Sequence, residues 1–209
     1  MAEVTATQQA ILASARRHFM EHGFKSASLN RIVADAGFTK GAFYGYYASK
    51  EELFDALVAQ TSQGLAQVMG NITAGWAGYP EGEQADHLDE AFFAQLPELA
   101  DFIVDHRDEL RLILTRSEGT RYEGFLESLV ENNAQHIEPM LSRTGLGGVD
   151  PDTYRLLMTA YYGTLARIAT GDYTRGQVVA KMRDVQVVFQ TGILALAQRR
   201  QGAQEKERS

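Results

Sequence analysis

Helical periodicity dominates the sequence: apolar residues recur every three or four positions along almost the whole chain, and the alternation typical of β-strands is scarce. Apolar side chains at this spacing form a stripe along one helix face, which must be buried against other helices. The predicted fold class is therefore all-α. The pattern predicts helices at residues 7–22, in a short segment after Ser28, at 40–46, from about 50 to 70, and at 86–105, 107–116, 121–142, 151–170 and 174–200.

Glycine and proline mark the predicted interruptions. A series of glycines from Gly64 to Gly78, followed by Pro80, predicts that the fourth helix weakens and ends near Gly70. Pro97 falls inside the next helix and is expected to break or kink it, because proline removes a backbone hydrogen bond.

Charge is distributed unevenly along the 209 residues, which carry a formal net charge of −7. Residues 24–50 hold four basic residues and one acid, so this segment is locally basic within an acidic chain. The length suits one domain or two small ones. We expect an N-terminal domain over residues 1–50, a helical domain over 51–200 that the fourth helix links to it, and a flexible polar tail over 201–209.

Composition rules out several kinds of chemistry. The absence of cysteine excludes disulfides, cysteine-ligated zinc, iron–sulfur clusters and thiol catalysis. No segment approaches the roughly 18 uninterrupted apolar residues of a membrane span. The N-terminus lacks the basic and apolar regions of a signal peptide. We therefore expect a cytoplasmic protein that has no cofactor and no membrane partner.

The N-terminal helices carry the strongest functional signal. Three short helices, with Gly37 in the turn between the second and third, fit the helix-turn-helix arrangement, whose third helix enters the major groove of DNA. The expected core residues are Leu29, Ile32, Val33, Phe38, Phe43 and Tyr47, and the expected exposed residues are Thr39, Lys40, Gly41, Ala42, Gly45 and Tyr46. The small residues on the exposed side would let the backbone approach DNA closely. Taken alone, the periodicity fits an ordinary core turn between helices equally well.

A run of motifs extends this signal over residues 11–54. It comprises IL-x-x-A-x-x-x-F, E-x-G-F-x-x-x-S-L, I-x-x-x-A-G, T-K-G-x-F-Y-x-Y-Y and S-K-E-E-L. This segment resembles the DNA-binding domain of the TetR family of bacterial transcriptional regulators. Two departures are mild: Ala42 stands where a hydroxyl is common in that family, and Tyr47 stands where phenylalanine is usual.

The resemblance implies a role in DNA binding for each matching position. It implies that Ser28, Tyr44 and Lys50 contact phosphates. It implies that Thr39, Lys40 and Tyr46 contact base edges. Arg31 could make either kind of contact, and Gly41 would let the protein backbone approach the DNA closely. A half-buried core position is the alternative for Tyr44, and a solvated capping position is the alternative for Lys50.

One metal-binding pattern occurs in the same segment. His18, Glu21 and His22 fit the H-x-x-E-H pattern of some zinc proteases, and histidines four residues apart share a helix face. However, this helix ends at Gly23, within the best-matched motif, and Phe19 is needed for its core. We therefore expect no metal site and no enzymatic activity.

The last two predicted helices favour a homodimer. The apolar residues of the helix at 174–200 cover more than one face, so this helix needs two burial partners. A four-helix interface between two copies supplies them, and the TetR resemblance implies the same arrangement. The expected interface residues are Leu157, Tyr161, Leu165, Val185, Phe189, Ile193 and Leu196. The alternative is a single, deeply buried core helix.

Aromatic residues are frequent between the DNA-binding segment and these last helices. A small, largely apolar effector would need an apolar pocket with a few polar groups. The candidate lining residues are Trp76, Phe93, Phe102, Arg111, Tyr122, Phe125 and Tyr162. Each of them fits a plain core position at least as well.

Together these features predict a ligand-responsive transcriptional regulator that binds a palindromic operator as a homodimer, with repression as the expected sign. An effector bound in the C-terminal domain would alter the spacing of the two recognition helices, and the fourth helix would transmit the change. An activator, or a regulator without an effector, would share the same DNA-binding sequence. A metal-dependent enzyme is a remote alternative.

Overall fold

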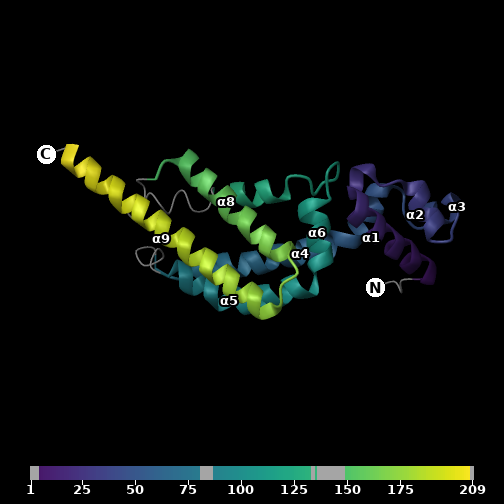
Figure 1. Cartoon of the computed structure of the whole chain (residues 1–209), viewed down its shortest axis with the longest axis horizontal. Helices are drawn as coiled ribbons and strands as arrows, with labels where there is room; N and C mark the ends of the chain where they lie inside the picture. The colour runs from purple at the N-terminus through teal and green to yellow at the C-terminus, as the bar shows by residue number, and fades with distance from the viewer. Residues whose placement is uncertain (1–4, 81–86, 133–134, 136–148, 208–209) are drawn as a thin grey trace. The chain divides into compact units, whose positions relative to one another are not determined.

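The structure, a computed structural model, describes residues 5–80, 87–132, 135 and 149–207, and the regular secondary structure of these residues is helical (Figure 1). The helices are α1 (Ala6–Ser26), α2 (Leu29–Asp35), α3 (Lys40–Tyr44), α4 (Lys50–Ala77), α5 (Leu88–Asp105), α6 (Arg107–Thr115), α8 (Pro151–Thr170) and α9 (Arg175–Glu207). The all-α fold class is confirmed. None of the described helices is both long and apolar enough to cross a membrane.

The chain forms two compact units, and each unit is assembled from two separate segments. The first contains Met1–Gly64 and His106–Glu123, and the second contains Leu65–Asp105 and Gly124–Ser209. Helix α4 contributes to both units. The first unit therefore extends beyond residue 50, where the sequence predicts the end of the N-terminal domain.

An aromatic cluster accounts for this extension. Phe54 of α4 meets Phe19 of α1 edge-on, with the ring centroids 5.2 Å apart, and meets Phe24 in the same way at 5.4 Å. The ring centroid of Tyr122 lies 6.0 Å from that of Phe54. All four side chains are buried. Because large aromatic rings contribute much of the energy of a core, the start of α4 and the segment around Tyr122 fold together with α1.

Helix α1 begins with a capping box and contains a kink. The Thr5 hydroxyl accepts a hydrogen bond from the Gln8 N–H, and the Gln8 side chain accepts one from the Thr5 N–H. Gly23 adopts φ 73°, in the left-handed region that favours glycine. The sequence predicts the helix end here, but helical residues continue to Ser26. Gly23 is therefore a kink rather than the end of the helix.

Two predicted interruptions are wrong. Helix α4 continues through Gly70 to Ala77, and α5 continues through Pro97 to Asp105. An interior glycine costs about 1 kcal/mol relative to alanine, which is a small penalty beside the cost of nucleating a new helix. Proline costs about 3 kcal/mol, and the buried leucines at positions 96 and 99 offset it, at roughly 1.5–3 kcal/mol for each buried side chain.

Two helix boundaries also differ from the prediction. Residues 121–124 form turns, with Gly124 at φ 74°, and helical residues begin only at position 125. The expected end of this helix at 142 lies outside the described residues. Helix α9 continues to Glu207 instead of ending near 200. The glutamine, alanine, glutamate and lysine residues of this last segment are good helix formers.

In the second unit, α9 packs against α5 and α8 (Figure 1). Arg175, the first residue of α9, pairs with Asp101 of α5, and its Nη2 donates to Asp101 Oδ2 at 3.0 Å. This hydrogen bond lowers the pKa of Asp101. Helix α8 begins as predicted: the Asp150 carboxylate accepts from the Thr153 N–H at 2.9 Å, and Pro151 is the first helical residue.

Candidate DNA-binding site

The described structure contains the predicted helix-turn-helix. Gly37 adopts φ 81° in the turn between α2 and α3, and the Phe38 N–H donates to the Val33 carbonyl oxygen at 3.1 Å. The Thr39 hydroxyl caps α3 by accepting from the Ala42 N–H at 3.3 Å. The predicted core residues Ile32, Val33, Phe43 and Tyr47 are buried, whereas Leu29 and Phe38 are partly exposed.

Helix α3 exposes the residues that the sequence assigns to base and backbone contacts. Thr39, Lys40 and Gly41 are exposed, and Tyr44 and Tyr46 are 57% and 37% exposed. Such exposure argues against a half-buried core position for Tyr44. A Cβ added at Gly41 would meet nothing closer than the Thr39 hydroxyl at 3.8 Å. Packing within the chain therefore does not require glycine at this position, which leaves close approach by a partner as a reason for it.

Helix α2 begins at a serine whose hydroxyl does not cap the helix. Ser28 has the extended backbone of an N-cap residue, but its side chain makes no capping hydrogen bond. Arg31, in the first turn of α2, is exposed and has no ion-pair partner among the described residues; the same holds for Lys40. A hydroxyl without a capping bond and two exposed cations in the same helix-turn-helix suit the anionic backbone of DNA.

Asp35, the single acidic residue of residues 24–50, is paired with a histidine. The Nε2 atom of His18 on α1 lies 2.7 Å from Oδ2 of Asp35 on α2, so the pair joins the two helices. The H-x-x-E-H pattern thus places His18 against a carboxylate within the fold. Among the described residues, no three metal-ligating side chains form a group that could hold a metal ion.

Lys50 is engaged within the chain. Its ammonium donates to the carbonyl oxygens of Phe24 at 2.8 Å and Ala27 at 3.2 Å, and lies 3.4 Å from the Lys25 carbonyl oxygen. It also lies 4.3 Å from the centroid of the Phe24 ring. Burial lowers the pKa of Lys50, although Glu51 opposes the effect. Within the chain, this lysine therefore directs its donors to the end of α1. The phosphate contact that the resemblance implies for it stays a prediction.

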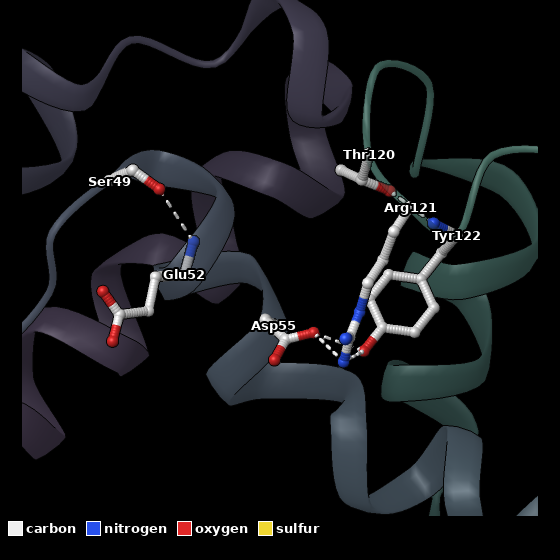
Figure 2. Close-up of polar contacts among 6 residues, drawn as sticks. All are labelled: Ser49, Glu52, Asp55, Thr120, Arg121 and Tyr122. Carbon is white, nitrogen blue, oxygen red and sulfur yellow. Dashed lines mark hydrogen bonds and ion pairs between the residues drawn. The ribbon is translucent and has the colours of Figure 1, made fainter.

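A polar cluster joins α4 to the turns that follow α6 (Figure 2). Asp55 Oδ1 accepts a hydrogen bond from the Tyr122 hydroxyl at 2.6 Å and lies 2.5 Å from Arg121 Nη2, which donates to the same hydroxyl at 2.9 Å. Burial raises the pKa of Tyr122, and the hydrogen bond to Asp55 raises it further. Asp55 and Arg121 were not predictable from the sequence, because no local pattern relates residues so far apart in the chain.

The start of α4 has most of the predicted capping box. The Ser49 hydroxyl accepts from the Glu52 N–H at 3.1 Å (Figure 2). The Glu52 carboxylate accepts from the Ala48 N–H at 2.5 Å, one residue before the position that the pattern predicts. Both bonds satisfy backbone donors at the helix start.

Helix α6 and the turns after it are also joined to α1. Arg16 Nη1 lies 2.5 Å from Glu109 Oε1, and the Phe24 N–H donates to the Arg116 carbonyl oxygen at 2.8 Å. Residues of the segment His106–Glu123 thus contact α1 and α4, the helices that surround the helix-turn-helix in the first unit.

The expected interface residues occupy two environments. Tyr161 and Leu165 are buried, and the Tyr161 hydroxyl donates to Gln186 Oε1 at 2.6 Å, so Tyr161 takes part in the packing between α8 and α9 within one chain. The other five, Leu157, Val185, Phe189, Ile193 and Leu196, are partly exposed. The apolar side chains that α8 and α9 expose most are Leu156 at 72%, Val188 at 68% and Val187 at 47%. The sequence analysis missed these three because a helical wheel alone does not show which of two apolar faces the chain itself covers.

The expected effector-pocket residues are divided between the units. Arg111 and Tyr122 belong to the first unit, and Phe93, Phe102, Phe125 and Tyr162 belong to the second. Tyr122 is buried and its hydroxyl donates to Asp55, which fits the core position that the sequence leaves open for it. The Arg183 guanidinium lies 4.8 Å from the ring centroid of Phe93. Trp76 lies in α4, but its side chain is outside the described part of the structure.

Sequence comparisons identify relatives of the N-terminal segment. Residues 11–57 match the family model described as bacterial regulatory proteins, tetR family. The chain is 36% identical over 67 residues to the HTH-type transcriptional repressor AcnR of Corynebacterium diphtheriae, an alignment that covers 32% of this chain and 35% of AcnR. It is 26% identical over 183 residues to the HTH-type transcriptional regulator UidR of Escherichia coli K12, covering 83% and 87%. The chain therefore matches about a third of the length of AcnR.

Solved structures share the fold over most of the chain. A TetR-like transcriptional regulator from Rhodococcus sp. RHA1 aligns with a TM-score of 0.52 and 20% identity, over 95% of this chain and 97% of the other. A transcriptional regulator from Aquifex aeolicus aligns with a TM-score of 0.51 and 19% identity, over 88% and 99%. The TetR resemblance that the motifs predict is confirmed by the match over residues 11–57, and the fold is shared along most of the chain.

Proposed function

We propose that this chain, whose N-terminal segment is of the TetR family, is a ligand-responsive transcriptional repressor that binds operator DNA as a homodimer. The observation that carries the proposal is the α2–turn–α3 arrangement, which buries Ile32, Val33 and Phe43. It exposes Lys40 and Tyr44 on α3, with Thr39 just before this helix and Tyr46 just after it. Helices presented in this way read base edges in the major groove. The name of AcnR as a repressor supports repression as the sign of regulation.

We assign the DNA contacts according to side-chain chemistry. The hydroxyls of Ser28 and Tyr44 bind phosphates and fix the register of the protein on the duplex. Lys40 donates to acceptors on base edges, with guanine O6 and N7 as its preferred partners, and Thr39 and Tyr46 add base-edge contacts. We also assign DNA contacts to Arg31 and Gly41. Arg31 binds a phosphate or a base, and Gly41, which has no side chain, lets the DNA backbone approach α3 closely.

We assign the dimer interface to the exposed apolar face of α8 and α9. Leu156, Val187 and Val188 supply apolar area on this face. Gly163 of α8 and Gly192 of α9 have nothing within 4 Å of an added Cβ, so each leaves room for a partner helix. A two-fold dimer places two recognition helices on half-sites about 34 Å apart or a multiple of that distance.

An effector would act from the second unit, which contains most of the aromatic candidates. Three backbone connections join the units, at Gly64–Leu65, Asp105–His106 and Glu123–Gly124. The first lies within α4, and the other two bound the segment that contacts α1 and α4. A small, largely apolar effector that favours one conformer of the second unit would alter DNA affinity through these connections, with a coupling of about 1–3 kcal/mol. Such a regulator would act in the cytoplasm, and it needs no cofactor or enzymatic activity.

Fluorescence anisotropy with DNA from immediately upstream of the protein's own gene tests this proposal, at two salt concentrations and with unrelated competitor DNA. We expect tight binding that survives the competitor, at two subunits or a multiple of two per site. Binding that is weak, indifferent to sequence and abolished by salt would indicate only electrostatic attraction. That result at every candidate operator would overturn the proposal.

A further inference from the structure

The corner between α1 and α2 (residues 24–28) leads directly into the helix-turn-helix. Gly23 kinks the chain before the corner, and the Ala27 N–H donates to the Gly23 carbonyl oxygen at 3.1 Å. Carbonyl groups at the end of a helix lack the partners that the next turn would supply. The direction in which the chain leaves this corner sets the position of Ser28.

The first residue of α4 holds this corner. The Lys50 ammonium donates to the carbonyl oxygens of Phe24 at 2.8 Å and Ala27 at 3.2 Å, with that of Lys25 at 3.4 Å, and the Phe24 ring lies beneath it at 4.3 Å. A lysine has three N–H donors and no acceptor, so these carbonyls use its full donor capacity. A phosphate could be bound only by giving up one of these bonds.

We propose that Lys50 is a positioning residue, which fixes the α1–α2 corner to the start of α4 and thereby holds the Ser28 hydroxyl in place for a DNA phosphate. Three observations carry the step from Lys50 to Ser28. The Ala27 carbonyl belongs to the peptide unit that joins Ala27 to Ser28, the Ser28 side chain makes no capping bond, and the Ser28 carbonyl oxygen accepts from the Ile32 N–H at 3.0 Å in the first turn of α2. The Ser28 part of this inference depends on the proposed function.

Two substitutions of Lys50 separate positioning from a direct phosphate contact. Lys50→Met keeps the length of the side chain and removes its donors. Lys50→Arg keeps the charge, but its planar guanidinium cannot direct hydrogens to three carbonyls around one point. We expect both variants to lower the thermal midpoint by roughly 3–8 °C. The control Lys181→Met, on α9 in the second unit, replaces an exposed lysine whose ammonium lies 4.7 Å from the centroid of the Tyr173 ring. Because methionine can still pack against this ring, the midpoint should fall by no more than about 2 °C. DNA binding should be unchanged.

DNA binding is then measured by anisotropy well below the thermal midpoints, over a range of salt concentrations. We expect Lys50→Met to weaken binding about tenfold, as loss of one phosphate hydrogen bond would, with an unchanged slope of log K against log salt. In the Ser28→Ala background, Lys50→Met should change DNA affinity less than about twofold. The reason is that Lys50 affects DNA binding by positioning the Ser28 hydroxyl, and this hydroxyl is absent in that background. A residue that only stabilises the fold would give neither the affinity loss nor this dependence on Ser28.

Other outcomes would overturn the inference. Lys50 would be a direct phosphate contact if three results occurred together. The slope of log K against log salt would be reduced by about one in Lys50→Met, Lys50→Arg would retain DNA affinity, and the thermal midpoints of both variants would be unchanged. Additive effects of Ser28→Ala and Lys50→Met would show that Lys50 does not act through Ser28. If the wild-type chain binds no DNA, the proposed function fails and the role of Ser28 fails with it. Lowered midpoints in both Lys50 variants would even then establish the contact between α4 and the corner.

Discussion

Lys40 and Tyr44 lie one turn apart on α3, and their chemistry suits different parts of the DNA. Lys40→Ala removes a donor assigned to base edges, so discrimination between operator and altered operator should fall by about 1–3 kcal/mol. Tyr44→Phe removes only a hydroxyl assigned to a phosphate, so affinity for all sequences should fall by a similar factor, about tenfold. Competition anisotropy with matched and mismatched DNA measures both effects.

The control for this pair is Lys181→Ala, which removes one exposed positive charge outside the helix-turn-helix. Its specificity ratio should equal that of the wild type. If Lys40→Ala behaves like this control, or if Tyr44→Phe changes specificity but not overall affinity, the assignment of these side chains is wrong.

At single residues, sequence reasoning succeeded where a local pattern carried the information. The helical spacing predicted that Phe43 and Tyr47 would be buried and that Lys40 and Tyr46 would be exposed, as they are. It could not predict the partners of Lys50, because the same lysine can cap a neighbouring helix or reach outward. Only the folded backbone brings the carbonyls of the α1–α2 corner within reach of its ammonium.

Among the elements, the long helix α4 offers a direct test of its continuity. Gly70 lies inside it, and an added Cβ would meet nothing within 4 Å. Gly70→Ala should therefore stabilise the protein by about 0.5–1 kcal/mol, since alanine loses less conformational freedom in a helix. Thermal unfolding followed by circular dichroism should show a midpoint raised by a few degrees.

Gly23→Ala is the matched comparison, because Gly23 adopts φ 73° where an L-residue is strained. This substitution should lower the midpoint. Equal effects of the two substitutions would contradict the difference in backbone conformation, and destabilisation by Gly70→Ala would favour the break that the sequence predicts there.

Helix α9 begins with a contact that responds to pH. Arg175 lowers the pKa of Asp101 below its ordinary value of 3.8 in the folded chain. The ionised carboxylate therefore stabilises the fold above that value, and the contribution is lost as pH falls through the lowered pKa. Asp101→Asn should reduce the thermal midpoint slightly at pH 7, because exposed ion pairs contribute little.

The midpoint difference between Asp101→Asn and the wild type should begin to shrink as the pH falls below about 4, where the unfolded chain binds the proton first. It should be lost as the pH falls through the lowered pKa of the folded chain. Asp184→Asn, which removes an exposed carboxylate on α9, serves as the control. A difference that stays constant down to about pH 3 would show that Asp101 acts through something other than its charge.

The helices were predictable as elements because their apolar spacing is local, but their ends depend on packing. Burial of Leu96 and Leu99 carries α5 through Pro97, although local propensity predicts a break there. The grouping of residues 106–123 with the first unit was also unpredictable. It depends on contacts such as Tyr122 with Asp55, between residues that no sequence period connects.

For the whole molecule, the proposed dimerisation through α8 and α9 can be tested by a single substitution. Val188 is 68% exposed in the single chain, so Val188→Asp leaves the fold of one chain largely unaffected. In the proposed interface its carboxylate would be buried without a partner, at a cost of several kcal/mol. Sedimentation velocity should show a dimer for the wild type and a monomer for the variant, with weakened operator binding.

Val104→Asp is the control, because Val104 is a 37% exposed valine on α5, outside the proposed interface. It should remain dimeric. A wild-type chain that is monomeric at micromolar concentration, or a Val188→Asp variant that stays dimeric, would contradict the proposed interface.

The central claim is that two copies of this chain present their α3 helices to a symmetric DNA site. Selection of bound sequences from a random duplex library, using the full chain at moderate salt, tests it most directly. We expect enrichment of a two-fold symmetric sequence, with half-site centres about 34 Å apart or a multiple of that distance. In Lys40→Ala the enrichment should be lost at one position of each half-site. No enrichment over the starting library, or an asymmetric sequence that Lys40→Ala selects equally well, would contradict it.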